Sequence, residues 1–411
     1  MHGAAALVIA LVLGGALFAS CPARADDGFA RFVSGLRPEA LALGVSEATF
    51  DAAFAGLAPD LSLPDLRVPG RPTAKGRGQA EFVKPPQDYL KTSYLARLAA
   101  RGRVLRERHA ATLARIEREI GVDRAALLAI WGRETAYGGY KPKHDAIRAL
   151  ATQAYVGRRK DFFRGELLSA LRLLQDGMPR AKMRASWAGA MGLTQFLPSE
   201  VVKHGTDMDG DGKVDLFDSV PDALASAARQ LKAKGWVLGL AWGYEVVLPA
   251  AERCALEGPP RRRTIAEWQR LGFKRVAGRT FPSATDAVEA YLMQPAGAYG
   301  PAFLVTENYR VIRRYNMSDL YAVFVGNLAD RIAGGGDFVT PWSDPRQLAT
   351  RDIEAVQRHL QESGHAAIDK VDGKIGSATR AEIGAYQIAA GITVDCWPTS
   401  GLLKHMRSVA R

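Results

Sequence analysis

The chain has 411 residues, of which 47% are hydrophobic and 24% charged, and its formal net charge is +12. This composition is that of an ordinary soluble globular protein with room for two or three domains. After the first residues no apolar run is long enough to cross a membrane. The basic balance suits an acidic polymer as a partner, and no basic groove with interleaved aromatic residues indicates nucleic acid.

Residues 1–25 have the pattern of a secretory signal. The apolar run "AAALVIALVLGGALFAS" precedes "CPARADD", and Ala23-Arg24-Ala25 fits the small-residue cleavage pattern. We therefore expect cleavage after Ala25 and export of the mature chain. Two alternatives stay open, because the run could remain as an anchor helix, or Cys21 could carry a lipid. Only the lipid would give a loose association with an outer membrane.

From residue 26 to about residue 240 the apolar spacing is mostly helical. "RHAATLARIEREIGV" places Leu113, Ile116 and Ile120 on one face, and "RGELLSALRLLQDG" and "VPDALASAARQLKAKGW" are helices that end at glycines. Residues 56–78 are rich in Pro and Gly, which predicts an extended segment.

Within this region, "DRAALLAIWGRETAYGG" combines an apolar helix with a carboxylate. Leu127, Ile130 and Trp131 fall on one helical face, and Glu134 continues it to the last turn, before Gly138 and Gly139. Burial and the negative end of the helix both disfavour an ionised carboxylate. Glu134 is thus a candidate general acid. The alternative is a surface carboxylate paired with an arginine such as Arg133.

The next unusual stretch is "SWAGAMGLTQFLPS", which gathers small residues between Ser186 and Gln195. Small side chains let a backbone approach another surface closely. That surface is either a ligand or a neighbouring helix, and the spacing alone leaves both open.

"DMDGDGKVDLFD" fits the spacing of a calcium-binding loop. The expected ligands are the carboxylates of Asp207, Asp209, Asp211 and Asp218, together with the backbone carbonyl of Lys213. The last position is Asp where Glu is usual, so a bidentate grip is less secure, and an acidic turn without metal is the alternative. We expect a structural calcium ion here and no organic cofactor.

Beyond residue 240 the pattern changes twice. Short β-rich runs between about residues 245 and 306 predict a small β-containing insertion. The stretch "AGGGDFVTPWSDP" predicts a linker over residues 336–346. Residues 347–411 predict a compact helical tail in which "VDGKIGSATRAEI" is echoed by "VDCWPTSGLLKHM". Such a linker implies that the tail folds apart from the rest of the chain.

Two cysteines, Cys254 and Cys396, remain after the expected cleavage. They are too few for a disulfide framework and lie in different candidate domains, so the sequence gives no reason to pair them.

Four stretches, taken together, resemble the lytic murein transglycosylase B family. They are "AIWGRETAYGG", "YVGRRKDFFRGEL", "SWAGAMGLTQFLPS" and "ENYRVIRRYNMSDLYAVFVGNLADRI", in this order and with similar gaps. The resemblance covers residues 30–334. The tail resembles the peptidoglycan-binding module of many cell-wall enzymes. The implied fold is mainly α (α+β): a lysozyme-like helical core over residues 26–335 with the β-containing insertion, followed by a small three-helix peptidoglycan-binding domain.

The family implies non-hydrolytic cleavage of the β-1,4 bond between N-acetylmuramic acid and N-acetylglucosamine in peptidoglycan, leaving 1,6-anhydro-muramic acid ends. Glu134 matches the catalytic acid/base. The residues that match sugar-contacting positions are Arg159, Ser186, Gln195, Phe196, Tyr315, Asn316 and Tyr321. The resemblance also implies a periplasmic enzyme of cell-wall turnover, acting as a monomer.

One carboxylate suffices for this reaction because the nucleophile, the C6 hydroxyl, belongs to the substrate, whereas ordinary glycosidases use two carboxylates. Asp161 and Glu166, the other carboxylates in the recognised stretches, are expected to be structural. Two other functions remain open: a muramidase that uses water on the same scaffold, and a catalytically silent peptidoglycan-binding protein.

Overall fold

The computed structural model describes residues 27–68, 70, 84–249, 254–343, 346, 348–365 and 367–409. The expected signal peptide, residues 1–25, lies outside these residues. Among the helices of the described part, none combines the length and the apolar character needed to cross a membrane.

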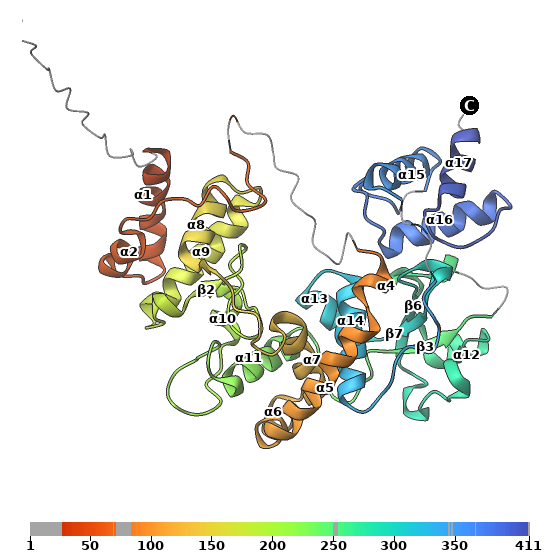
Figure 1. Cartoon of the computed structure of the whole chain (residues 1–411), viewed down its shortest axis with the longest axis horizontal. Coiled ribbons are helices and arrows are strands. Elements are labelled where there is room, and N and C mark those ends of the chain that lie inside the picture. Colours follow the sequence, from red (N-terminus) through yellow and green to blue (C-terminus); the bar gives the residue numbers. More distant parts are fainter. Residues whose placement is uncertain are drawn as a thin grey trace, which may run out of the picture.

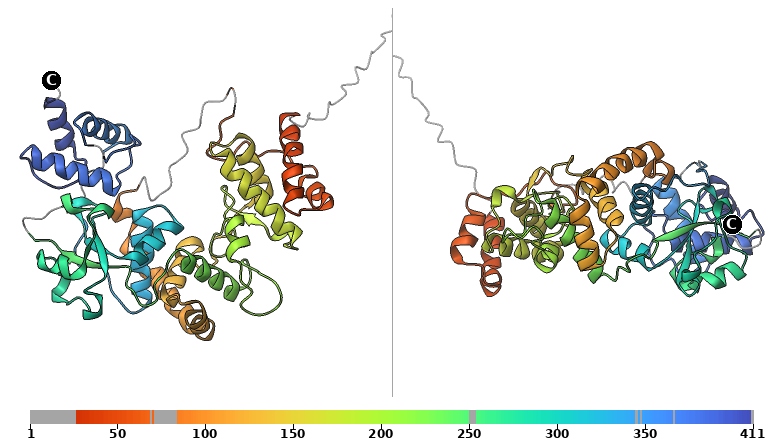
Figure 2. Two further views of the ribbon diagram at one scale, coloured as in Figure 1. Left: turned by 180° about the vertical axis from the view of Figure 1, so that it is seen from behind. Right: turned by 90° about the horizontal axis from the view of Figure 1, so that it is seen from below.

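The described part is mainly helical, as the sequence predicts, and contains a five-stranded sheet and a two-stranded ladder (Figure 1). The helices before the sheet are α1 (Asp27–Ala42), α2 (Glu47–Phe54), α4 (Pro86–Tyr89), α5 (Thr92–Arg108), α6 (Ala110–Ile120), α7 (Arg124–Thr135), α8 (Ala146–Val156), α9 (Lys160–Gln175), α10 (Pro198–His204) and α11 (Val220–Ala233). After the sheet follow α13 (Glu307–Tyr315) and α14 (Asp319–Ile332). Figure 2 shows α1 and α2 at one end of the molecule and the sheet at the other.

Helix α7 is the centre of the helical core. It packs against α5, α6, α11 and α14, and every residue from Ala126 to Gly132 is buried. The sequence predicted one apolar face, but the helix is apolar and covered on all sides, which is typical of a helix in the middle of a large core.

The sheet is antiparallel and has the strand order β4-β6-β7-β3-β5. Its strands are β3 (Gly243–Val247), β4 (Arg263–Thr264), β5 (Lys274–Arg275), β6 (Glu289–Met293) and β7 (Ala302–Val305). With α12 (Ile265–Arg270) the sheet encloses a small core of its own, which includes Trp268 and Phe273. A separate two-stranded ladder, β1 (His144–Asp145) with β2 (Arg184–Ala185), lies beside α8.

The tail forms three helices, α15 (Thr350–Glu362), α16 (Ser377–Ala389) and α17 (Ser400–Val409). Their shared core contains Val356, Leu360, Ile383, Leu402 and Met406. In Figure 1 this module lies above the sheet, with α16 nearest to it.

The module is fixed to the core, so the expectation of a tail that folds apart is wrong. A disulfide joins Cys254 to Cys396 across a sequence separation of 142 residues. The buried Arg380 guanidinium binds the buried Glu257 carboxylate, at 3.1 Å from Nε to each oxygen. The sequence could not pair the cysteines because docking alone brings them together.

Candidate active site

The chain reverses sharply directly after Glu134. Helix α7 ends at Thr135, three residues before the glycines at which the sequence placed its end, and Ala136, Tyr137 and Gly138 follow with φ of 48°, 59° and 78°. Left-handed backbone is strained for alanine and tyrosine, and such strain persists only where the surroundings hold it.

Tyr137 supplies that hold. Its hydroxyl donates a hydrogen bond to the Leu98 carbonyl at 3.0 Å. Its ring occupies a slot between α5 and α7 that is open because Gly102 and Gly132 have no side chain. A Cβ at Gly102 would lie 2.5 Å from the Tyr137 hydroxyl, and one at Gly132 would lie 2.7 Å from the ring. Gly132 thus makes room for Tyr137, and Tyr137 fixes the turn that follows Glu134.

The same turn is tied to the loop of residues 186–196. The buried Thr135 hydroxyl donates to the Leu193 carbonyl at 2.7 Å and accepts from the Gly138 N–H at 3.0 Å. Glu134 therefore lies where α7 meets this loop.

Two tyrosines, Tyr321 and Tyr315, stack beside Glu134, and we call these three residues the Glu134 ladder. The Tyr321 hydroxyl, from α14, donates a 2.5 Å hydrogen bond to Oε1 of Glu134. The Tyr315 ring is stacked parallel to the Tyr321 ring, with centroids 6.4 Å apart, and its hydroxyl donates to the Thr194 carbonyl. Burial raises the pKa of both phenols well above 10, and the Glu134 carboxylate adds to the effect. Tyr321 therefore stays protonated and remains a hydrogen-bond donor to Glu134 at neutral pH.

Arg133 supports this ladder from the other side. Its Nη2 donates to the Tyr89 hydroxyl at 2.6 Å, and its guanidinium lies 5.6 Å from the Tyr321 ring centroid and 5.3 Å from that of Phe324. Burial alone would lower the Arg133 pKa, but Tyr89 and Glu134 outweigh it and the pKa is raised. A permanently charged cation is thus held against the aromatic rings.

The loop of residues 186–196 is built largely by its own polar groups. Ser186 Oγ accepts the N–H groups of Ala188 and Ala190 at 3.3 and 3.2 Å. Gln195 has a left-handed φ of 54° and donates through Nε2 to the Gly192 carbonyl at 3.1 Å. Both expected sugar-contacting residues are half-buried, so part of each is turned inward to hold the loop.

The small residues of this loop explain its tight packing. A Cβ at Gly189 would lie 2.4 Å from the Leu150 side chain, and one at Gly192 would lie 2.7 Å from the Leu216 carbonyl oxygen. At these two glycines the close approach is therefore to the protein's own core. Phe196 is 2% exposed and meets the Tyr315 ring edge-on at 83°, so it packs against Tyr315.

Two expected contact residues lie at the margins of this arrangement. Asn316 directly follows α13 and is half-buried, and its carbonyl accepts the Ser318 N–H at 2.7 Å. Arg159 precedes α9, and its guanidinium lies over Phe162 and Phe163 at 4.9 and 5.0 Å. None of the contacts recorded for the described residues joins Arg159 to the Glu134 ladder.

Glu166 has the structural role that the sequence predicts. It is buried and accepts the Ser199 N–H at 3.0 Å and the Ser199 hydroxyl at 2.8 Å. These bonds satisfy the first turn of α10, where a backbone N–H would otherwise have no partner.

The acidic loop gathers three of the four expected carboxylate ligands. Asp207, Asp209 and Asp211 each offer an oxygen atom within 4.8 Å of the others. Hard oxygen donors at this spacing fit a calcium ion. Asp218 does not join them, because its Oδ2 lies 2.7 Å from the Lys182 ammonium and its side chain is mostly exposed. Lys213, expected to bind through its carbonyl, is exposed in the same loop.

A residue that the sequence reasoning missed holds this loop in shape. The buried Asp222 carboxylate accepts the N–H groups of Met208 at 2.8 Å and Asp215 at 2.9 Å, and also that of Asp209. It lies in the first turn of α11. One buried carboxylate thus crosslinks both halves of the loop.

Comparison with known proteins identifies the family. The model of the transglycosylase SLT domain matches residues 28–330. The chain belongs to this family. The membrane-bound lytic murein transglycosylase B of Escherichia coli (strain K12) is 31% identical over 220 residues, which are 52% of this chain and 58% of that one. The chain thus spans a little over half the length of this curated relative.

Solved structures agree with this result. SltB3 from Pseudomonas aeruginosa, in complex with NAG-anhNAM-pentapeptide, has a TM-score of 0.84 and 41% identity and covers 92% of this chain and 99% of its own. The Escherichia coli lytic transglycosylase Slt35, in complex with calcium, has a TM-score of 0.58 and 24% identity over 78% of this chain and 95% of its own, a likeness of fold. The helical core of this chain therefore has the fold of these solved lytic transglycosylases, as the sequence predicted.

Within this transglycosylase domain, the sequence proposed Glu134 and the two tyrosines of the ladder as site residues, named Arg133 only as an alternative ion-pair partner of Glu134, and gave no role to Tyr89. The signal for Arg133 was its place directly before Glu134. The signal for Tyr89 was absent, because it lies in a four-residue helix, α4, which is too short to show a helical period.

Proposed function

We propose that this protein is a lytic transglycosylase that cleaves the β-1,4 bond between N-acetylmuramic acid and N-acetylglucosamine in peptidoglycan and forms a 1,6-anhydro end. One observation supports this most. Glu134, at the end of a buried helix, accepts a hydrogen bond from a phenol that stays protonated. The family match over residues 28–330 supports the reaction class, and we assign the acid/base role to Glu134.

In the proposed reaction, Glu134 acts first as the acid and then as the base. Because Tyr321 occupies Oε1, we assign the transferable proton to Oε2. This proton passes to the glycosidic oxygen as the bond to muramic acid C1 breaks. The C6 hydroxyl of the same sugar then attacks C1 and returns its proton to the carboxylate. Atoms balance without water, and the tethered nucleophile has a high effective concentration.

The ladder residues hold the carboxyl group in place during both proton transfers. Tyr321 can stabilise the anionic form by the same hydrogen bond that it makes at rest, since hydrogen bonding to the charged form favours it. Ser186, Gln195 and Asn316 are half-buried, and we propose that their exposed portions contact the sugars. SltB3, the similar solved chain, was crystallised with a peptidoglycan fragment, which supports a glycan strand as substrate.

For the acidic loop we propose a structural calcium site at Asp207, Asp209 and Asp211, with the Lys213 carbonyl as a fourth ligand. The proximity of the three carboxylates supports it. Asp218 would have to leave Lys182 to take part. Calcium bound here would fix the segment between α10 and α11 and supplies no step of the reaction.

We propose that the mature protein begins after the signal, acts in the periplasm as a monomer and consists of a catalytic domain up to residue 335 and a wall-binding module from residue 347. The disulfide between Cys254 and Cys396 supports an oxidising compartment.

The deciding experiment is product analysis of digested sacculi by liquid chromatography and mass spectrometry after borohydride reduction. Anhydro ends resist reduction, and they weigh about 18 mass units less than hydrolytic ends because no water is added. We expect anhydro ends to dominate, because the tethered C6 hydroxyl has a higher effective concentration at C1 than captured water. Mainly reducible ends would instead establish a muramidase, and intact sacculi would leave a silent binding protein.

A further inference from the structure

The C-terminal module contains two loops with the same internal frame. In the first copy, Gln357 Oε1 accepts the N–H groups of Asp372 and Gly373 at 3.0 and 2.8 Å, and Asp372 Oδ1 accepts the Lys374 N–H at 2.9 Å. In the second copy, Gln387 Oε1 accepts the N–H groups of Asp395 and Cys396 at 3.0 and 2.9 Å, and Asp395 Oδ1 accepts the Trp397 N–H at 3.0 Å. Gly373 and Cys396 share a left-handed φ of 69° and 54°. The echo in the sequence is therefore a repeated structure.

The second copy binds a peptide segment of the core. The Asp395 carbonyl accepts the Ala298 N–H at 2.9 Å, and Asp395 Oδ2 accepts the Tyr299 hydroxyl at 2.8 Å. The contact is close, because a Cβ on Gly297 would lie 2.3 Å from the Asp395 carbonyl oxygen. The outer side of this loop frame thus offers two acceptors, a carbonyl and a carboxylate oxygen, to the donors of a bound peptide.

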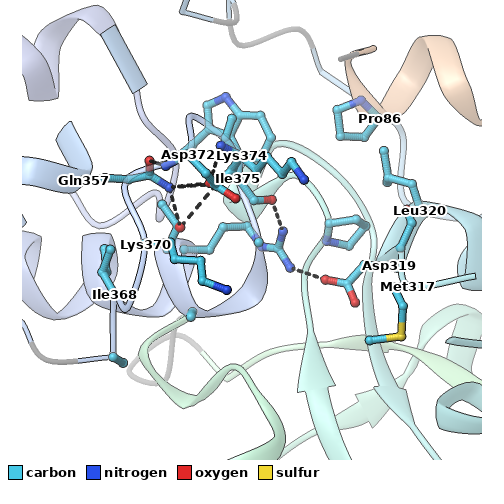
Figure 3. A pocket seen from close by; sticks show the side chains of 18 of the residues that line it. Pro86, Met317, Asp319, Leu320, Gln357, Ile368, Lys370, Asp372, Lys374 and Ile375 are labelled. Carbon is cyan, nitrogen blue, oxygen red and sulfur yellow. Dashed lines mark hydrogen bonds and ion pairs between the residues drawn. The ribbon is translucent and has the colours of Figure 1, made fainter. Parts of the chain in front are cut away.

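In the first copy, the equivalent acceptors face a hollow. Among the described residues, no recorded hydrogen bond or ion pair uses the Asp372 carbonyl or its Oδ2. Asp372 is exposed and lines a cavity of about 400 Å³ between the module and the core. Figure 3 shows Asp372, Lys370 and Ile368 of the module on one side of the hollow and Pro86, Asp319 and Leu320 of the core on the other.

The residues that line the hollow fit a peptide better than a sugar. Exposed charges of both signs border it, namely Lys84, Asp369, Lys370, Asp372 and Lys374. Apolar side chains such as Pro86, Met317, Leu320 and Ile375 lie between them. Among its lining residues Trp397 is the aromatic one, and it is 2% exposed, so no ring face is available for stacking on an uncharged sugar. The lining instead complements a short chain with carboxylates, an amine and small apolar groups.

We propose that this hollow binds the peptide branch of the wall polymer, a short acyl peptide that carries both carboxylates and an amine. Asp372 accepts the donors of the peptide, as Asp395 does in the second copy, and Lys370 pairs with a peptide carboxylate. The identity of the peptide rests on the proposed function. The module then recognises peptide-bearing strands, while the second copy anchors the module to the core.

The test is titration calorimetry of the full chain with the free tripeptide L-Ala-γ-D-Glu-diaminopimelate, which contains no sugar. We expect D372N and K370E each to weaken binding about tenfold or more, as expected for losing one charged hydrogen bond or ion pair. K404E, which changes an exposed lysine of α17 outside the hollow, is the matched control and should bind like the parent. Unchanged melting curves would show that the variants fold.

Equal affinity of the parent, D372N and K370E would overturn the proposal, as would a peptide-free glycan chain that displaces the tripeptide. Cleavage of peptide-free glycan chains is measured in parallel and should be the same for the parent and both variants. A protein that binds the tripeptide through Asp372 but cleaves no glycan would contradict the proposed function and leave this inference standing.

Discussion

Glu134 and the acidic loop both present carboxylates, but the protein builds the two regions differently. The Glu134 carboxyl group is half-buried, and its partner Tyr321 is 187 residues further along the chain. The carboxylates of Asp207, Asp209 and Asp211 lie within five residues of sequence and are partly or fully exposed. A proton-transferring carboxyl group needs surroundings that exclude water, and distant segments must supply them. A cation needs exposed oxygen atoms, which one loop can supply.

The largest expected effect concerns the buried carboxyl group. E134Q should keep the fold and glycan binding but lose cleavage of sacculi about 10³-fold or more, because an amide cannot act as a general acid. Release of soluble muropeptides measures the activity. E119Q, at an exposed position of α6, should be fully active. Retention of more than a few per cent of activity in E134Q would place the catalytic acid elsewhere.

The next effect concerns the partner of that carboxyl group. Y321F removes one hydrogen bond to a carboxylate, so we expect kcat to fall about tenfold to 100-fold with little change in KM. The pKa of Tyr321 in the folded protein lies well above 10. Its hydroxyl therefore donates the hydrogen bond to Glu134 at every pH below the ordinary phenol pKa, and this bond is lost only when the pH rises through the raised pKa.

The ratio of parent to Y321F activity should therefore stay constant between pH 5 and pH 9. Y386F, in the module, serves as the control and should behave like the parent. A ratio that collapses within this range would mean that Tyr321 titrates and is itself the proton donor.

For the acidic loop, the buried carboxylate that holds it from α11, Asp222, should affect stability most. D222N exchanges an acceptor of three N–H groups for an amide, and we expect it to lower the free energy of unfolding by about 1.5–3 kcal/mol. Urea unfolding, followed by circular dichroism, measures this. D286N, at an exposed position, should change the midpoint little. An unchanged midpoint in D222N would show that the loop holds its shape without Asp222.

The smallest effect concerns the exposed members. Calcium should raise the melting temperature of the parent, because an ion bound only by the folded state stabilises it by mass action. D207A combined with D211A should abolish the rise, and D286A should keep it. Calorimetry with calcium and with a chelator measures both. Equal transitions of the parent under the two conditions would leave the loop an acidic turn.

Removal of Lys182 tests whether Asp218 can join the calcium site. Lys182 lies 2.8 Å from Asp215 and 2.7 Å from Asp218, so it competes with a cation for Asp218. We expect K182A to increase calcium affinity several-fold, because Asp218 becomes available as a ligand. Titration calorimetry measures the affinity, and K404A is the control. An affinity that is unchanged or lower would show that Asp218 takes no part in binding.

Sequence by itself determined the features that depend on neighbouring residues. The spacing of acidic residues in "DMDGDGKVDLFD", the helical periods and the echo in the tail are all local patterns, and local backbone preferences and turn chemistry are enough to express them. The four separated stretches also indicated the family, and by resemblance they made Glu134 the candidate catalytic residue.

Only the tertiary structure decided which distant groups meet. The Tyr321 bond to Glu134, the Arg133 bond to Tyr89 and the disulfide between Cys254 and Cys396 each join segments far apart in sequence. No period or spacing encodes such pairs, because they form where buried surfaces pack together. The docked module is the clearest case: the Gly-rich linker predicted a free tail, while a buried Arg380–Glu257 pair and a disulfide, which no local pattern reveals, fix it to the core.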